Sequence, residues 1–138
     1  MKKLFYILLL INCFSLTAQE EEAQEVKNNE TEKIEEFVDQ DPTYPGGVSG
    51  FRNFLASNIN YPQKAVNKNI QGKCYVSFVV DKNGNVIDVK IAKGIKNCKA
   101  CNKEAMRVIK LTSGKWTPAK VNGNDVKYKY MQIIDFQL

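Results

Sequence analysis

Histidine is absent from this chain of 138 residues, tryptophan occurs once and proline only four times. Without imidazole there is no Ser-His-Asp or Cys-His catalytic centre and no histidine-ligated metal site. Acids are also scarce in residues 42–138, where five carboxylates are scattered among sixteen Lys and Arg residues. A hydrolase needs a nucleophile with a base, or two carboxylates placed together. We find no such set and expect a non-enzyme without a cofactor or a bound metal.

The chain also lacks an apolar run long enough to span a membrane, which takes about 20 residues. Its long apolar run covers residues 4–14, follows Lys2 and Lys3, and precedes a small residue, Ala18. This order is typical of a cleaved secretory signal, here residues 1–18. The alternatives to cleavage are lipidation at Cys13 and retention as a short anchor. We expect an exported protein.

Residues 19–41 are expected to form a disordered acidic tether. Residues 20–41 carry ten acids and two lysines, a net charge of −8, whereas residues 42–138 have a net charge of +11. A segment with so much charge and so few large apolar residues cannot bury enough surface to fold alone. Ile34, Phe37 and Val38 recur at helical spacing, which predicts a helical turn next to the domain.

The expected domain covers residues 42–138. Apolar residues recur at helical spacing over residues 48–58 and 102–111, and a short helix is expected to begin at Pro62. Alternation predicts strands over residues 73–81, 86–92 and 126–138, with a hairpin turn at residues 81–85. The predicted fold is α+β, a small three-stranded antiparallel sheet with two main helices on one face, in the order α-β-β-α-β.

The expected domain holds three cysteines, of which Cys98 and Cys101 form a C-x-x-C pair. Such a pair is a redox motif, half of a zinc site or a disulfide. Only Cys74 remains as a further ligand, which speaks against zinc, and a redox cysteine usually stands at a helix N-terminus, which Cys98 precedes. Cys74 shares a strand face with Val76 and Phe78, which favours a buried thiol. We expect a disulfide between Cys98 and Cys101.

Several short motifs follow one another along residues 42–138. They are Pro42-x-Tyr44-Pro45-Gly46-Gly47, Tyr61-Pro62-x-x-Ala65, the strand and turn from Gly72 to Val86, Glu104-Ala105-x-Arg107-Val108, Trp116-x-Pro118, Asn122-Gly123 and Phe136. Their order and spacing resemble the C-terminal domain of TonB energy transducers. Two positions depart from that pattern, because Ala119 replaces a usual glycine and Gln132 stands where proline is common. The long proline-rich spacer of the family is also missing.

The resemblance implies a periplasmic protein that binds TonB-dependent outer-membrane transporters and supports energy-coupled transport. In that family the closing strand lends its edge to a short extended segment of the transporter, the TonB box. The length and alternation of residues 126–138 suit this role, and lysines there keep the edge from pairing with itself. The residues expected to contact the partner are Val126, Lys127, Tyr128, Lys129, Tyr130, Met131 and Ile133, with Tyr61 and Pro62 as a further contact.

Other functions and partners stay open at this point. A stand-alone periplasmic module would dock receptors or another envelope component without being energised, and a thiol-redox protein is a third alternative. An ExbB/ExbD-type motor is a further partner if the chain stays anchored in the membrane. Assembly of two copies into a homodimer also stays open. Nucleic acid is not expected, because an exported chain rarely meets it, and the basic surface suits anionic envelope components better.

Overall fold

The computed structural model describes residues 34–138, so the predicted signal segment and most of the predicted tether lie outside the described residues. Within this range no helix has the length and apolar character needed to cross a bilayer. The elements are β1 (Ile34–Glu35), α1 (Gly47–Asn58), α2 (Gln63–Asn67), β2 (Gly72–Val80), β3 (Val86–Lys93), α3 (Lys99–Lys110), β4 (Ala119–Val121) and β5 (Asn124–Phe136).

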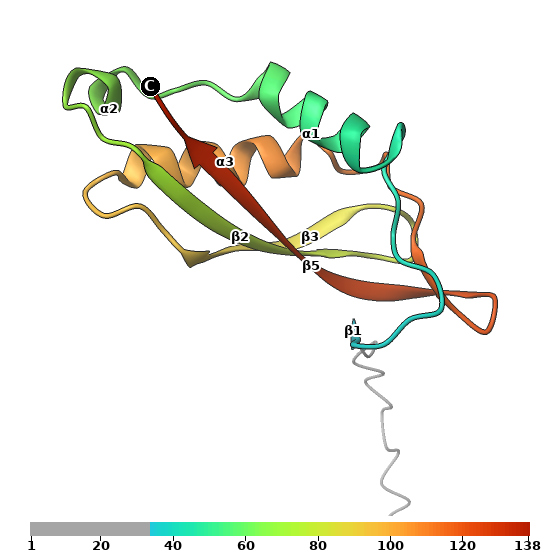
Figure 1. Ribbon diagram of the computed structural model, residues 1–138. Coiled ribbons are helices and arrows are strands. Elements are labelled where there is room, and N and C mark those ends of the chain that lie inside the picture. Colours follow the sequence, from blue (N-terminus) through green and yellow to red (C-terminus); the bar gives the residue numbers. More distant parts are fainter. Residues whose placement is uncertain (1–33) are drawn as a thin grey trace, which may run out of the picture. The chain divides into compact units, whose positions relative to one another are not determined.

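The strands form a mixed sheet in the order β1-β5-β2-β3, with β4 paired to β5 as a hairpin. β2 is antiparallel to both β3 and β5, whereas β1 runs parallel to β5, with Ile34 opposite Lys127 and Glu35 opposite Tyr128. The predicted three-stranded antiparallel sheet is the centre of this larger sheet, so the predicted strand count is wrong (Figure 1). Strands of two and three residues are too short to show an alternation in the sequence.

Helices α1 and α3 lie on one face of the sheet (Figure 1), and the α+β class is confirmed. Every second residue of β2 points toward these helices, as the two-residue period of a strand requires. The buried side chains between the layers include Cys74, Val76, Phe78 and Val80 of β2, Phe51 and Leu55 of α1, and Ala105, Val108 and Ile109 of α3.

Strand β3 departs from the alternation that the sequence predicts. Its pairing with β2 shifts in register twice, and Asp88 adopts a positive φ of 50°. A bulge adds one residue and thereby changes which side chains face inward. As a result Val86 packs against the core together with Val89 and Ile91, whereas simple alternation over residues 86–92 predicts that Ile87 shares a face with Val89 and Ile91.

Residues 34–41, which the sequence places in the tether, pair with the sheet. Residues 34–35 are a strand where the apolar spacing predicts a helical turn. Farther along, the N–H groups of Asp39 and Gln40 donate to the Lys120 carbonyl at 2.9 and 3.2 Å, and Lys120 donates back to Gln40 at 2.9 Å. The helical-turn prediction is wrong because an isolated turn is costly to nucleate, whereas an existing strand offers backbone partners directly.

Candidate functional site

The outer edge of β5 exposes backbone groups to a partner. On its inner side β5 pairs with β2 from Tyr128 to Phe136, and on its outer side β1 reaches only as far as Tyr128; β4 pairs with residues 124–126. In the part of the chain that the structure describes, no strand or bridge pairs with the outer side of residues 129–136. Backbone N–H and C=O groups alternate in direction along a strand. Residues 129–136 therefore form an edge that can accept another strand.

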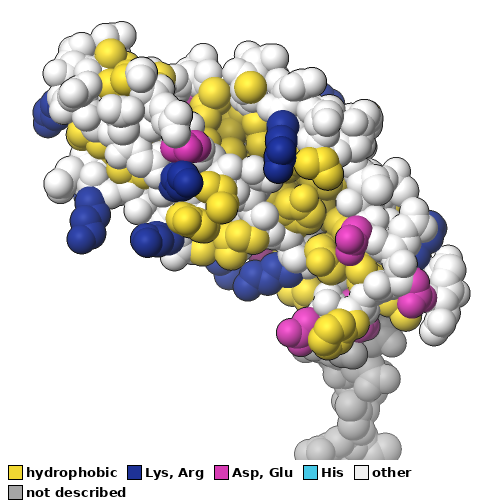
Figure 2. All heavy atoms as spheres, in the orientation of Figure 1, with side chains coloured by type: hydrophobic (Ala, Val, Ile, Leu, Met, Phe, Trp, Pro, Cys, Tyr) yellow, Lys and Arg dark blue, Asp and Glu magenta, His cyan; other side chains and the backbone are white. Residues whose placement is uncertain are grey.

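A groove of about 700 Å³ runs beside this edge, between β5 and α1. Its helical wall consists of Arg52, Leu55, Ala56 and Ile59, which recur at the i, i+3, i+4 and i+7 spacing of one helix face. Residues 130–135 of β5 and Lys73 of β2 complete the lining. Figure 2 shows hydrophobic side chains gathered along this part of the surface, with Lys and Arg side chains at its margins.

The structure divides the predicted contact residues into two groups. Val126 pairs with Ala119 of β4, and Lys127 and Tyr128 lie opposite β1, so these three residues already have a neighbouring strand as a partner. The other predicted residues of the strand lie in the unpaired stretch; they are Lys129, Tyr130, Met131 and Ile133. The α1 wall of the groove is not among the contact residues predicted from the sequence, although the helical spacing of residues 52–59 was a signal for it.

Tyr130 and Met131 point to opposite faces of β5. The Tyr130 ring lies inside the helix-covered layer, with its centroid 5.4 Å from that of Phe78 and 5.6 Å from that of Trp116. The Met131 side chain is 50 % exposed on the other face, as is Ile133 at 44 %. Tyr130 therefore fixes the strand in the core while its backbone stays at the edge.

Glu104 and Arg107 of α3 hold the end of α1 in place. The Glu104 carboxylate accepts hydrogen bonds from the Asn60 N–H at 2.7 Å and from Arg107 at 2.6 and 2.8 Å, and Arg107 also donates to the Asn58 carbonyl at 2.7 Å. The hydrogen bond from Arg107 lowers the pKa of Glu104 against the opposing effect of burial, and it raises the pKa of Arg107. This network positions the α1 wall of the groove.

Comparison with known proteins identifies the family. Residues 57–138 match the family described as the Gram-negative bacterial TonB protein C-terminal. The chain belongs to this TonB C-terminal family. Domains of this family are periplasmic, non-catalytic interaction domains of energy transducers. The prediction of the family from the ordered motifs is confirmed.

One solved structure supports the fold, and a second is less similar. The solution structure of the Helicobacter pylori TonB C-terminal domain is 22 % identical, with a TM-score of 0.51, over 65 % of this chain and 91 % of that one. The Pseudomonas aeruginosa TonB C-terminal domain is 18 % identical, with a TM-score of 0.47, over 58 % of this chain and 78 % of that one. No curated protein matches the chain.

Tyr61 and Pro62, which belong to a TonB-like motif, lie in the packing between α2 and the end of β5. The Tyr61 hydroxyl donates to the Ile70 carbonyl at 2.6 Å, and its ring meets the Phe136 ring edge-on at a centroid distance of 5.4 Å. Pro62 is the N-cap of α2. Neither residue lines the groove beside β5.

Gln132 stands where TonB C-terminal domains often have proline. Its side-chain amide donates to the carbonyl of the next residue, Ile133, at 2.8 Å. Proline has no backbone N–H, so glutamine keeps one more donor in β5 than the usual residue would.

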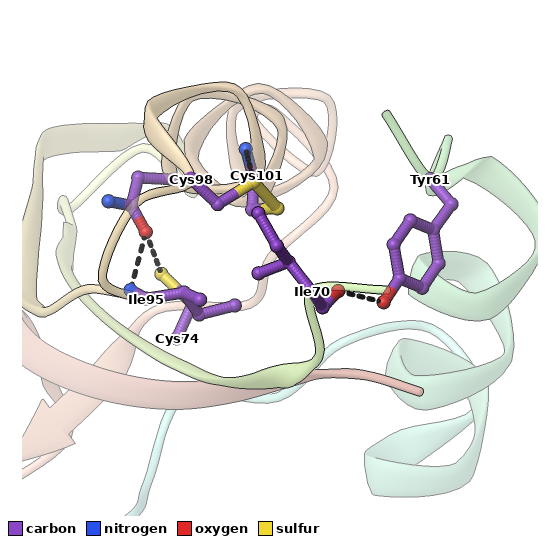
Figure 3. Close-up of a disulfide and its surroundings, with 7 residues drawn as sticks. Tyr61, Ile70, Cys74, Ile95, Cys98 and Cys101 are labelled. Carbon is purple, nitrogen blue, oxygen red and sulfur yellow. Dashed lines mark hydrogen bonds between the residues drawn. A yellow bond between two sulfur atoms is a disulfide. The ribbon is translucent and has the colours of Figure 1, made fainter. Parts of the chain in front are cut away.

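The C-x-x-C pair forms a disulfide at the start of α3 (Figure 3). The predicted helix start at Asn102 is wrong, because α3 begins at Lys99 and Cys98 is its N-cap, whose sulfur accepts the Cys101 N–H at 3.1 Å. Asn102 instead turns inward, where its Oδ1 accepts the Ile95 N–H at 2.9 Å. The first turn is thus capped by Cys98, which leaves the Asn102 side chain to serve the preceding loop.

The position of Cys98 at a helix N-terminus is one that redox-active cysteines use, but both bonded cysteines are buried. A reductant therefore has little access to the sulfurs.

Cys74 is buried, as predicted. Its thiol donates a hydrogen bond to Asn102 Oδ1 at 3.6 Å, and burial raises the pKa of Cys74. Among residues 34–138 no three His, Cys, Asp or Glu side chains are grouped so as to hold a metal ion. Burial likewise raises the pKa of Tyr44.

Proposed function

We propose that this domain binds the extended periplasmic segment of a TonB-dependent outer-membrane transporter, accepts it as a strand on the outer edge of β5, and thereby supports energy-coupled transport. The observation that carries the proposal is the unpaired backbone of residues 129–136 beside the groove between β5 and α1. Main-chain hydrogen bonds along such an edge give affinity that tolerates sequence variation, and alternate side chains give specificity. The role requires no catalytic residue.

The topology suits a domain that carries mechanical load. A partner strand on β5 would be pulled in the plane of the sheet, next to a strand that is paired with β2 at nine successive positions. The load on β5 would then be shared among many backbone hydrogen bonds at once. The aromatic side chain of Tyr130, packed against Phe78 and Trp116, adds a side-chain attachment of the same strand to the core.

Two proline variants of neighbouring residues test strand addition. The N–H groups of Met131 and Gln132 point to opposite sides of β5, so one faces β2 and the other faces the open edge. Proline is tolerated at an edge-facing N–H and not at a paired one. Of Met131→Pro and Gln132→Pro, one should unfold, and the other should fold and bind at least tenfold more weakly to a synthetic peptide from the periplasmic segment of a transporter of the same bacterium.

Folding is measured by circular dichroism and binding by fluorescence anisotropy. These residues make a better pair than one that includes Tyr130, because Tyr130→Pro would also remove a core ring. Leu111→Ser, at an exposed side chain that does not line the groove, serves as the control that should leave binding unchanged. If both proline variants unfold, or if the folded one binds with full affinity, strand addition at this edge is wrong.

The stand-alone, non-energised module is the second candidate function, favoured by the signal-like residues 1–18. N-terminal sequencing of the protein from cells separates the two candidates. A chain that begins at Gln19 has no covalent link to the inner membrane, which supports the non-energised module. An intact N-terminus supports an anchored transducer with an ExbB/ExbD-type motor.

A further inference from the structure

Residues 34–35 lie against the same edge of β5 that the proposed partner would use. Ile34 lies opposite Lys127 and Glu35 lies opposite Tyr128, in a parallel pairing. The order of the strands puts β1 on the outer side of β5, directly before the unpaired residues 129–136. The chain thus supplies a strand of its own to the beginning of the edge.

This internal strand is short and weakly buried. Its pairing covers two residues, the Ile34 side chain is 43 % exposed, and the Phe37 side chain is 85 % exposed. The chain is attached again at Asp39, whose backbone N–H donates to Lys120 and whose carboxylate accepts the Asn122 N–H at 2.6 Å. Release of β1 from β5 would therefore leave this second attachment intact.

An open cavity of about 450 Å³ lies where β1 would continue along β5. Its walls include Ile34 and Glu36 on one side and Lys129 and Met131 on the other. β1 does not fill this space, because residues 36–38 leave the strand. A longer extended segment in the position of β1 would continue into the cavity and along the unpaired edge.

The chemistry of the internal strand complements the surface that it meets. Residues 34–38 read Ile-Glu-Glu-Phe-Val, a mixture of apolar and acidic side chains. The edge carries Lys127 and Lys129, and the groove beyond it is lined by Arg52 and Lys73, with Asp135 as its single acid. Opposite charges on neighbouring strands stabilise their pairing.

We infer that residues 34–38 are an internal occupant of the β5 edge. The partner is likewise an extended segment of apolar and acidic residues, and this partner segment displaces β1 to pair with Lys127 and Tyr128. The inference rests on the proposed function of the edge. An internal strand has a high effective concentration, so a partner is bound only if it forms more pairs than β1 does. The longer unpaired stretch after Tyr128 supplies those pairs.

Proline variants of β1 in the full chain test the displacement. The N–H groups of Ile34 and Glu35 point to opposite sides, so only one of Ile34→Pro and Glu35→Pro removes a hydrogen bond to β5. The probe is a fluorescent eight-residue peptide with the sequence of residues 33–40. It should bind the released variant at least fivefold more tightly than the wild type and the other proline variant. Ile34→Ala and Glu35→Ala keep both N–H groups and control for loss of the side chain.

The outcomes distinguish this inference from the proposed function. Equal affinity for the wild type and both proline variants overturns the displacement of β1 and leaves strand addition intact. A peptide in which both glutamates are replaced by lysine should bind at least tenfold more weakly at low salt, and equal binding overturns the acidic chemistry of the partner. If neither the peptide of residues 33–40 nor the transporter peptide binds any variant that folds, the proposed function itself fails.

Discussion

Replacement of the single tryptophan by alanine should lower the free energy of unfolding by about 3–5 kcal/mol, as truncation of a buried aromatic side chain does. Trp116 is 6 % exposed. Its ring centroid lies between 4.9 and 5.8 Å from those of four other rings, which belong to Tyr44, Phe51, Phe78 and Tyr130. Because these rings come from the lead-in to α1, from α1, from β2 and from β5, they cannot all move together to fill the cavity.

Part of the expected loss is polar. The indole N–H donates to the Thr112 hydroxyl at 3.1 Å, and this hydroxyl donates to the Ile109 carbonyl at 2.6 Å. Thr112 is fully buried, so water does not replace the indole as its partner. Thr112→Val leaves the indole N–H without an acceptor and should cost about 1–3 kcal/mol. Trp116→Phe keeps most of the ring packing, removes the donor, and should cost less than Trp116→Ala.

Urea unfolding followed by far-ultraviolet circular dichroism measures these losses, since tryptophan fluorescence disappears with the only tryptophan. The double variant Trp116→Phe with Thr112→Val removes both partners of the hydrogen bond, so its loss should be smaller than the sum of the two single losses. A loss under about 1 kcal/mol for Trp116→Ala would refute the buried position of the ring. Strict additivity would refute the hydrogen bond.

Three further predictions test other contacts. Gly84→Ala should cost at least about 1 kcal/mol more than Gly123→Ala in urea unfolding. Both glycines have φ +78°, so the backbone strain is the same, but of the two only Gly84 would bring a Cβ against the Trp116 backbone oxygen. Equal losses would contradict this. Removal of the disulfide between Cys98 and Cys101, which are three positions apart, in the double variant Cys98→Ala with Cys101→Ala should lower the free energy of unfolding by about 2 kcal/mol, and an unchanged thermal midpoint of this variant would argue against it. The pKa of Glu104 is lowered on folding, so as the pH falls the unfolded state binds the Glu104 proton before the folded state does. The stabilisation that ionised Glu104 gives the folded state is therefore complete above the ordinary pKa of 4.5 and is lost as the pH falls through the lower folded value. Glu104→Gln should therefore flatten the decline of the thermal midpoint in acid, and a decline as steep as in the wild type would refute the assignment.

The long elements and the family could be predicted from the sequence alone. The alternation of residues 73–80 and the helical spacing of residues 48–58 each indicate one buried face. Side chains that face the core recur every second residue in a strand and every 3.6 residues in a helix. The motifs of the TonB C-terminal family are short, but their order along 97 residues (42–138) is specific. The start of α3 could not be predicted, because it depends on the Cys98 sulfur as the cap and on the inward turn of Asn102.

The acceptor edge depended on the tertiary structure. The alternation of β5 tells which side chains face the helices, but backbone N–H and C=O groups are the same in almost every residue and carry no sequence signal. Which of them stay unpaired on the outer side depends on where β1 ends, and this strand comes from residues 34–35. β1 stops at Tyr128, and from Lys129 onward the edge of β5 is open beside α1 only because the fold brings no other strand there within residues 34–138.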